Sequence, residues 1–108
     1  MKLDPRDGVA FDGVHIWVAN QVANNVTRLT RDGVTTGTFP VETAPAGVVF
    51  DERAIWVTNS GSNTVSQLDY TNWLLIGSYT VGNSPAGICF DGNAVWIAKK
   101  TSNNLLRR

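Results

Sequence analysis

FDGVHIWVAN at residues 11–20 recurs as FDERAIWVTN at residues 50–59 and as FDGNAVWIAK at residues 90–99. The three copies therefore start 39 and then 40 residues apart. A repeat of about 40 residues, built from short apolar runs and turns, is typical of a β-propeller, in which each four-stranded blade needs a neighbour to bury its faces. The sequence thus predicts an all-β repeat protein.

Each copy divides into strands at the same places. The run Pro45–Phe50 ends at Asp51, and the other two copies have Asp-Gly there, a strong hairpin signal between apolar runs. The next run, Ala54–Asn59, is apolar at successive positions, so both faces of that strand must be covered, as they are between stacked blades. Two further strands are predicted at Val65–Leu68 and Gly77–Val81. The predicted repeat domain spans residues 1–108, with blade 1 at 5–44, blade 2 at 45–84 and a partial blade 3, without its outer strand, at 85–108.

Three blades are fewer than the four to eight of a closed propeller. Each terminal blade would leave uncovered an apolar face on the order of 300 Å², from strand spacing and rise. At about 25 cal/mol per Å² this corresponds to roughly 8 kcal/mol per face, comparable with the whole stability of a small domain. We therefore expect a homodimer that completes a six-bladed ring, with a two-fold axis along its channel. The alternative is that these residues are part of a longer propeller.

Composition narrows the range of partners. Nine basic and nine acidic residues cancel, so no overall field favours nucleic acid or an anionic membrane. No apolar run approaches the roughly 20 residues of a membrane span, and the first residues do not resemble a secretory signal, which makes the cytoplasm the default location. Cys89 is the only cysteine, which excludes an intramolecular disulfide, and we expect it to be a small apolar core residue.

The candidate binding surface consists of the connections after the second strand and before the first strand of each blade. In a propeller these loops share one face around the channel, where function usually gathers. They offer hydrogen-bonding groups but few groups that exchange protons near neutral pH, which favours binding over catalysis. The candidate ligand-binding residues are Asn20, Asn24, Glu42, Asn59, Asn63, Asn83, Lys99 and Asn103. Trp73, which has no counterpart in the other repeats, is a candidate contact residue.

Other recurrent residues have both a structural and a functional interpretation. The repeated aspartate could hold a cation, but it lies at a hairpin turn, where Asp accepts backbone hydrogen bonds, and the turn interpretation is favoured. The repeated tryptophan could stack on a sugar or base, but its position in mid-strand favours the core. His15 could be a base or metal ligand, but its place at a strand edge favours a structural role. The repeated residues are Asp12, Asp51 and Asp91, and Trp17, Trp56 and Trp96. No catalytic residue, metal site or cofactor is predicted.

The motifs Pro-x-Gly-Ile/Val-x-Phe-Asp-Gly, Ile-Trp-Val-Ala-Asn and Asn-x-Val-x-x-Leu resemble those of the YVTN and streptogramin-lyase (virginiamycin B lyase-like) β-propellers over nearly all of the chain. The resemblance implies a propeller fold. The group includes a magnesium-dependent lyase that opens a cyclic depsipeptide with histidine and glutamate residues, but His15, Glu42 and Glu52 match none of those positions. We therefore expect a non-catalytic, self-assembling scaffold or binding disc for a protein, peptide or glycan. The alternative is a metal-dependent lyase or hydrolase formed across a homo-oligomer.

Overall fold

The described residues of the chain form eleven β-strands and no helix. The computed structural model describes residues 8–69, 74–81, 84–99 and 104–107. In this part of the chain there is accordingly no helix that could cross a membrane. The predicted all-β architecture is confirmed.

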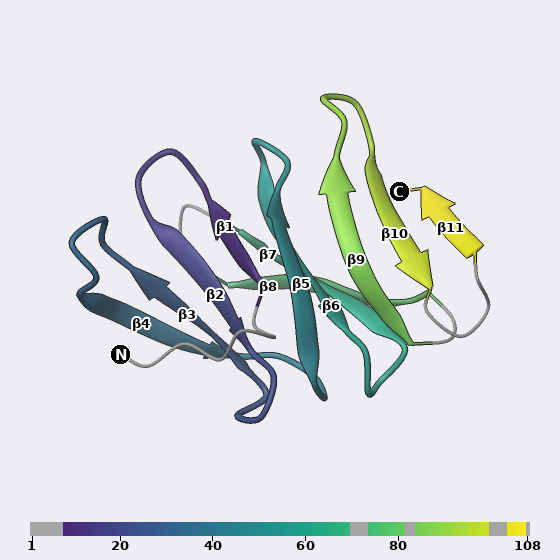
Figure 1. The fold of residues 1–108 in the computed structure, drawn as a ribbon, viewed down its shortest axis with the longest axis horizontal. Helices are drawn as coiled ribbons and strands as arrows, with labels where there is room; N and C mark the ends of the chain where they lie inside the picture. The colour runs from purple at the N-terminus through teal and green to yellow at the C-terminus, as the bar shows by residue number, and fades with distance from the viewer. Residues whose placement is uncertain (1–7, 70–73, 82–83, 100–103, 108) are drawn as a thin grey trace.

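The strands form three antiparallel sheets that lie side by side, each a meander in which strands pair in chain order (Figure 1). Blade 1 contains β1 (Val9–Phe11), β2 (Ile16–Asn20), β3 (Asn25–Leu29) and β4 (Thr35–Pro40). Blade 2 contains β5 (Pro45–Phe50), β6 (Ala54–Asn59), β7 (Thr64–Asp69) and β8 (Leu75–Thr80). Blade 3 contains β9 (Pro85–Phe90), β10 (Val95–Lys99) and β11 (Asn104–Arg107). Four, four and three strands are the predicted pattern.

The first strands of the blades approach one another closely. Strand β5 contacts both β1 and β9, which places these strands on the inner side of the arc. A Cβ atom on Gly8 would lie 2.3 Å from the carbonyl oxygen of Ala46, and one on Gly47 would lie 2.4 Å from that of Ala86. Only glycine allows the two backbones to come so near. The repeated glycine is therefore explained by contact between blades.

The core lies between the blades, in two apolar layers. Trp17 faces blade 2, whereas Ile55 and Val57 of β6 point back toward it. Trp56, between those two residues, faces blade 3. The layer between blades 1 and 2 consists of Trp17, Ala19, Val26, Val48, Ile55, Val57 and Leu68. The layer between blades 2 and 3 consists of Ala54, Trp56, Val65, Val81, Val95 and Ile97. Strand β6 is buried along its whole length because it has a blade on each side, as the apolar run predicts.

The two end faces, the side of blade 1 away from blade 2 and the side of blade 3 away from blade 2, differ from the inner ones. Val9 is 55% exposed, whereas its equivalent Val48, which faces blade 1, is only 7% exposed. At the other end Trp96 is half-buried, whereas Trp17 is fully buried. Some apolar side chains that are covered inside the arc are therefore uncovered at its ends, although Val18, which pairs with Val9, is 1% exposed.

The expectation that Cys89 is a core residue is wrong. Cys89 is exposed and pairs with Trp96 on the end face of blade 3. Its equivalent Val49 pairs with Trp56 and packs into the layer against blade 3. The repeat position is indeed an interior one, but no further blade lies next to Cys89.

Candidate functional site

Each aspartate at the start of a hairpin is bonded to its own turn and to a tryptophan. In blade 2, Asp51 Oδ1 accepts the backbone N–H groups of Arg53 (2.9 Å) and Ala54 (2.7 Å), and Oδ2 accepts the indole N–H of Trp56 (2.7 Å). Asp12 and Asp91 make the same three contacts in their blades. The turn interpretation is confirmed. The bond to the tryptophan five residues later was missed, although the constant spacing in all three copies could have indicated it.

These hydrogen bonds change the acidity of Asp12. Its burial raises the pKa, but the bonds from the His15 backbone, the Trp17 indole and the Val14 backbone outweigh that effect, and the charge of His15 adds to them. The pKa of Asp12 is therefore held below its usual value of 3.8. The carboxylate stays charged and fixed at the hairpin.

Two faces of the arc are defined by the strand ends. We call the end with the β1–β2, β5–β6 and β9–β10 hairpins the hairpin face, and the end with the β2–β3, β6–β7, β4–β5 and β8–β9 connections the loop face. In Figure 1 the β9–β10 hairpin lies at the upper edge and the β2–β3 turn at the lower edge. His15 lies on the hairpin face and Glu42 on the loop face, at opposite ends of the strands.

On the loop face, two predicted binding residues link neighbouring loops. Asn24 and Asn63 have positive φ angles of 57° and 58°, a conformation that Asn tolerates in turns. Asn24 Oδ1 accepts the backbone N–H of Ala44 at 2.9 Å, and Asn63 Oδ1 accepts that of Ser84 at 2.8 Å. Each asparagine thus holds the connection to the next blade against its own turn.

Two further predicted residues end the second strand of their blades. Asn20 Nδ2 donates to Asn25 Oδ1 and to Thr27 Oγ1, both at 2.7 Å. Asn59 is fully buried, and its Nδ2 donates to Ser66 Oγ at 2.9 Å. These amides tie the second strand to the third.

The remaining predicted residues are dispersed. Glu42 is exposed and accepts a hydrogen bond from Ser78 Oγ on β8. Lys99 ends β10, where its backbone pairs with Asn104 of β11. Asn83, Asn103 and Trp73 lie outside the described residues. The binding roles of all these residues stay predictions. Among the residues that the structure describes, no group of three or more His, Cys, Asp or Glu side chains is placed to hold a metal ion.

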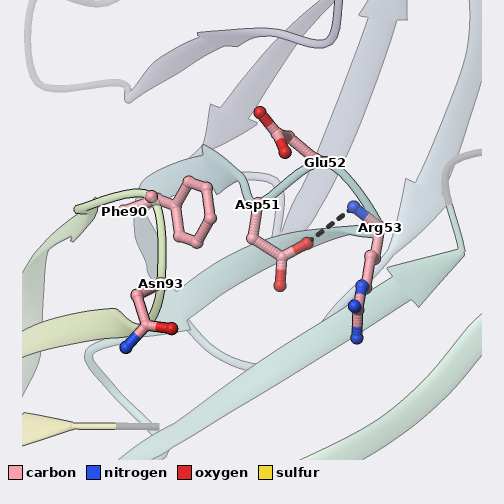
Figure 2. A pocket seen from close by; sticks show the side chains of 6 residues that line it. Asp51, Glu52, Arg53, Phe90 and Asn93 are labelled. Carbon is pink, nitrogen blue, oxygen red and sulfur yellow. Dashed lines mark hydrogen bonds between the residues drawn. The ribbon is translucent and has the colours of Figure 1, made fainter.

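A pocket of about 480 Å³ lies on the hairpin face, between the β5–β6 and β9–β10 hairpins (Figure 2). It is lined by Asp51, Glu52, Arg53, Phe90, Gly92 and Asn93. Sequence reasoning missed it because the recurrent polar residues favoured the loop face. A signal was present: Glu52-Arg53 stands where the other repeats have Gly13-Val14 and Gly92-Asn93.

Comparison with known proteins identifies structural but not sequence relatives. No family model matches the chain. No curated protein matches it significantly. Among solved structures, a catalytically inactive virginiamycin B lyase from Staphylococcus aureus with quinupristin superimposes with a TM-score of 0.78, at 25% identity, over 91% of this chain and 35% of that one. A streptogramin B lyase matches 94% of this chain and 39% of its own at 19% identity, with a TM-score of 0.72.

The chain has a streptogramin lyase-like β-propeller fold. The hydrazine synthase of Kuenenia stuttgartiensis also matches 99% of this chain and 36% of its own, at 24% identity and a TM-score of 0.71. Proteins with different activities therefore share this three-blade arc. The chain spans 35 to 39% of the length of these three solved structures. The streptogramin lyase-like resemblance of the sequence motifs is thus confirmed at the level of fold.

Proposed function

We propose that this β-propeller module is a self-assembling, non-catalytic scaffold. Its two end faces pack against a second copy, blade on blade, and the resulting six-bladed ring is a binding disc for a protein, peptide or glycan. The proposal depends on the geometry and the area of the end faces.

The repeated glycine of the inner strand carries the proposal. In blades 1 and 2, the place that a Cβ would take on Gly8 or Gly47 is filled by a carbonyl oxygen of the next blade. The equivalent glycine of blade 3, Gly87, meets only the Cβ of Ala98 of its own blade, at 3.6 Å. Blade 3 thus has the glycine that permits close contact between blades, although no further blade of the described residues lies beside it. We infer that the end face of blade 3 is built to receive one.

The area of the end faces supports assembly. Two blade-on-blade contacts in a head-to-tail dimer would bury about 1,200 Å² in total, if each face measures about 300 Å², which is at the lower limit for stable protein interfaces. The surfaces involved are apolar, with Val9 and Phe11 at one end, 55% and 48% exposed, and Trp96 at the other. Burial of apolar area of this size favours a dimer at micromolar concentration.

The placement of the polar residues supports a binding scaffold over a lyase. On the loop face, each of the side-chain amides of Asn20, Asn24, Asn59 and Asn63 makes at least one hydrogen bond to a neighbouring loop or strand. The buried Oδ1 of Asn59 has no hydrogen-bond partner within the described residues. His15 and Glu42, which the lyase alternative would use, lie at opposite ends of the strands. Within one chain they do not converge on one reacting group.

Light scattering coupled to size exclusion tests the assembly. At micromolar concentration we expect a mass of twice the 11.7 kDa of one chain. Gly87→Ala should reduce the mass to that of one chain, because its Cβ would occupy the place of the incoming carbonyl, and should leave the far-UV spectrum unchanged. Val22→Ala, at a side chain that is 82% exposed and away from the end faces, is the control. A single-chain mass for the unmodified protein would contradict the dimer.

A further inference from the structure

The hairpin face holds a cation on an aromatic ring in blade 1. The guanidinium carbon of Arg31 lies 5.2 Å from the ring centroid of Phe11, within the range of a cation–π contact. Phe11 is the last residue of β1, and the equivalent last residue of β9 is Phe90. The repeat thus places a phenylalanine at the same point of the hairpin face in each of these two blades.

Phe90 lines the pocket between blades 2 and 3, but no cation of the described residues lies over its ring. Figure 2 shows the ring beside Asp51, with Glu52 on one side of that residue and Asn93 on the other. Phe90 is half-buried and packs against the layer between blades 2 and 3, and the rest of its side chain borders the pocket. This part of the ring is the first part of a cation site.

Glu52 supplies the counter-charge. Asp51 already accepts three N–H groups of its own hairpin, whereas the exposed Glu52 carboxylate makes no hydrogen bond or ion pair within the described residues. With Arg53 the lining carries two negative charges and one positive, so its net charge is negative. A carboxylate next to an aromatic ring favours an organic cation, because a metal ion gains little from the ring and requires more oxygen ligands.

Arg53 lies on the opposite side of Asp51 from Phe90 and Asn93 (Figure 2). Its side chain points away from that of Glu52, so the pocket has an acidic part and a basic part. The Arg53 guanidinium makes no ion pair within the described residues, and it is a hydrogen-bond donor. This part of the pocket therefore suits a carboxylate oxygen.

We propose that the pocket between the β5–β6 and β9–β10 hairpins binds a basic amino acid, either free or as the last residue of a peptide. Its guanidinium or ammonium group lies over Phe90 with Glu52 as counter-ion, and its carboxylate accepts hydrogen bonds from Arg53. Both hairpins belong to one chain, so this site does not depend on ring closure. This site assigns a class of ligand to the proposed binding disc, and it places the binding surface on the hairpin face, opposite to the loop face.

Three small probes separate the charges of the ligand. All three probes keep an ammonium group. L-arginine has in addition a guanidinium and a carboxylate, agmatine has the guanidinium without the carboxylate, and L-citrulline has the carboxylate with a neutral urea in place of the guanidinium. Titrations followed by nuclear magnetic resonance, with ionic strength held constant, should show saturable shifts at the Glu52, Arg53 and Asn93 amides with L-arginine and weaker ones with agmatine. Loss of the cation–π contact and of the ion pair with Glu52 should weaken citrulline binding about tenfold relative to L-arginine.

Substitutions of Glu52 and Arg53 test which group of the ligand each residue contacts. Glu52→Gln should weaken binding of L-arginine about threefold, as expected for one exposed ion pair, whereas Glu42→Gln on the loop face should not. Arg53→Gln should weaken L-arginine but strengthen agmatine, because it removes a donor for the carboxylate and a charge that repels the cation. Equal affinity for citrulline and L-arginine, or unchanged binding in Glu52→Gln, would overturn the proposal. A thermal unfolding curve for each variant separates a lost contact from a lost fold.

A peptide that ends in Arg, compared with the same peptide amidated at its C-terminus, distinguishes the source of the ligand. Tighter binding of the peptide with a free carboxylate than of free L-arginine would identify a peptide terminus. The reverse order would identify the free amino acid. If both forms of the peptide bind equally well, the assignment of Arg53 as the partner of the carboxylate is wrong.

Discussion

Gly47→Ala tests whether the blades are held at contact distance by their inner strands. The new Cβ would lie 2.4 Å from the carbonyl oxygen of Ala86 and 2.9 Å from Cγ2 of Ile88. Ordinary contact begins at 3.4 Å, so β5 and β9 would have to separate by about 1 Å. Because β5 lies between β1 and β9, it cannot move away from blade 3 without compressing its contact with blade 1.

The expected cost follows from three effects. Overpacking of this kind destabilises by about 1 to 3 kcal/mol. The hydrogen bond from the Thr58 hydroxyl to the Ala86 carbonyl (2.9 Å) would be lost, at about 1 kcal/mol. Alanine also lowers the entropy of the unfolded chain, and this offsets the loss of stability by about 0.4 to 1 kcal/mol. We therefore expect Gly47→Ala to lower the free energy of unfolding by about 2 kcal/mol.

Urea denaturation followed by tryptophan fluorescence measures this change, and Gly87→Ala is the matched control. The two glycines occupy the same position in neighbouring repeats, but only Gly47 has a carbonyl against it. The urea midpoint should fall by about 1 M for Gly47→Ala, whatever the protein concentration. The midpoint of Gly87→Ala should fall only at concentrations where the unmodified protein is dimeric. Equal losses in both variants at high dilution would refute close contact between the inner strands as the reason for the repeated glycine.

Further predictions concern single contacts. Thr58→Ala should destabilise the fold by about 1 to 2 kcal/mol in urea denaturation, because its buried hydroxyl accepts from the Gly47 N–H and donates to the Ala86 carbonyl. Since the pKa of Asp12 is lowered on folding, the stability it contributes is present above pH 3.8 and is lost as the pH falls below that value; urea midpoints measured across this range should change less in Asp12→Asn. Glu52→Gly should raise the melting temperature slightly, because relief of a φ of 76° outweighs the added chain entropy by about 0.5 kcal/mol; a lower melting temperature would show that the Glu52 conformation is not strained.

Much of the fold could be predicted from the sequence. The turn aspartates and the doubly apolar second strand were interpreted correctly, because the same local pattern occurs in each repeat. Trp17 and Trp56 are core residues as predicted, whereas Trp96, on the end face of blade 3, is only half-buried. Strand ends differ by no more than a few residues, as at β8, where the strand predicted at Gly77–Val81 is observed at Leu75–Thr80. Cys89 was misjudged because repeat position shows which face a residue occupies but not whether that face is covered.

The candidate sites were harder to predict from the sequence. Asn24 and Asn63 looked like free polar groups on a binding face, and their bonds to Ala44 and Ser84 join residues about 20 positions apart. The pocket beside Phe90 also joins two hairpins from different repeats. Neither partner of such a contact carries a local signal that identifies the other.

The sequence by itself determined the blade, because hydrophobic period, turn residues and hairpin spacing act over a few residues and recur in each copy. Only the tertiary structure decided what lies between blades. A neighbouring carbonyl lies against Gly8 and against Gly47, whereas no carbonyl lies against Gly87. Glu52, Arg53 and Phe90 border one pocket. The physical reason is that strand formation depends on neighbours along the chain, whereas burial and pocket formation depend on the distance and angle between sheets. Those quantities are set by the packing of all the blades together.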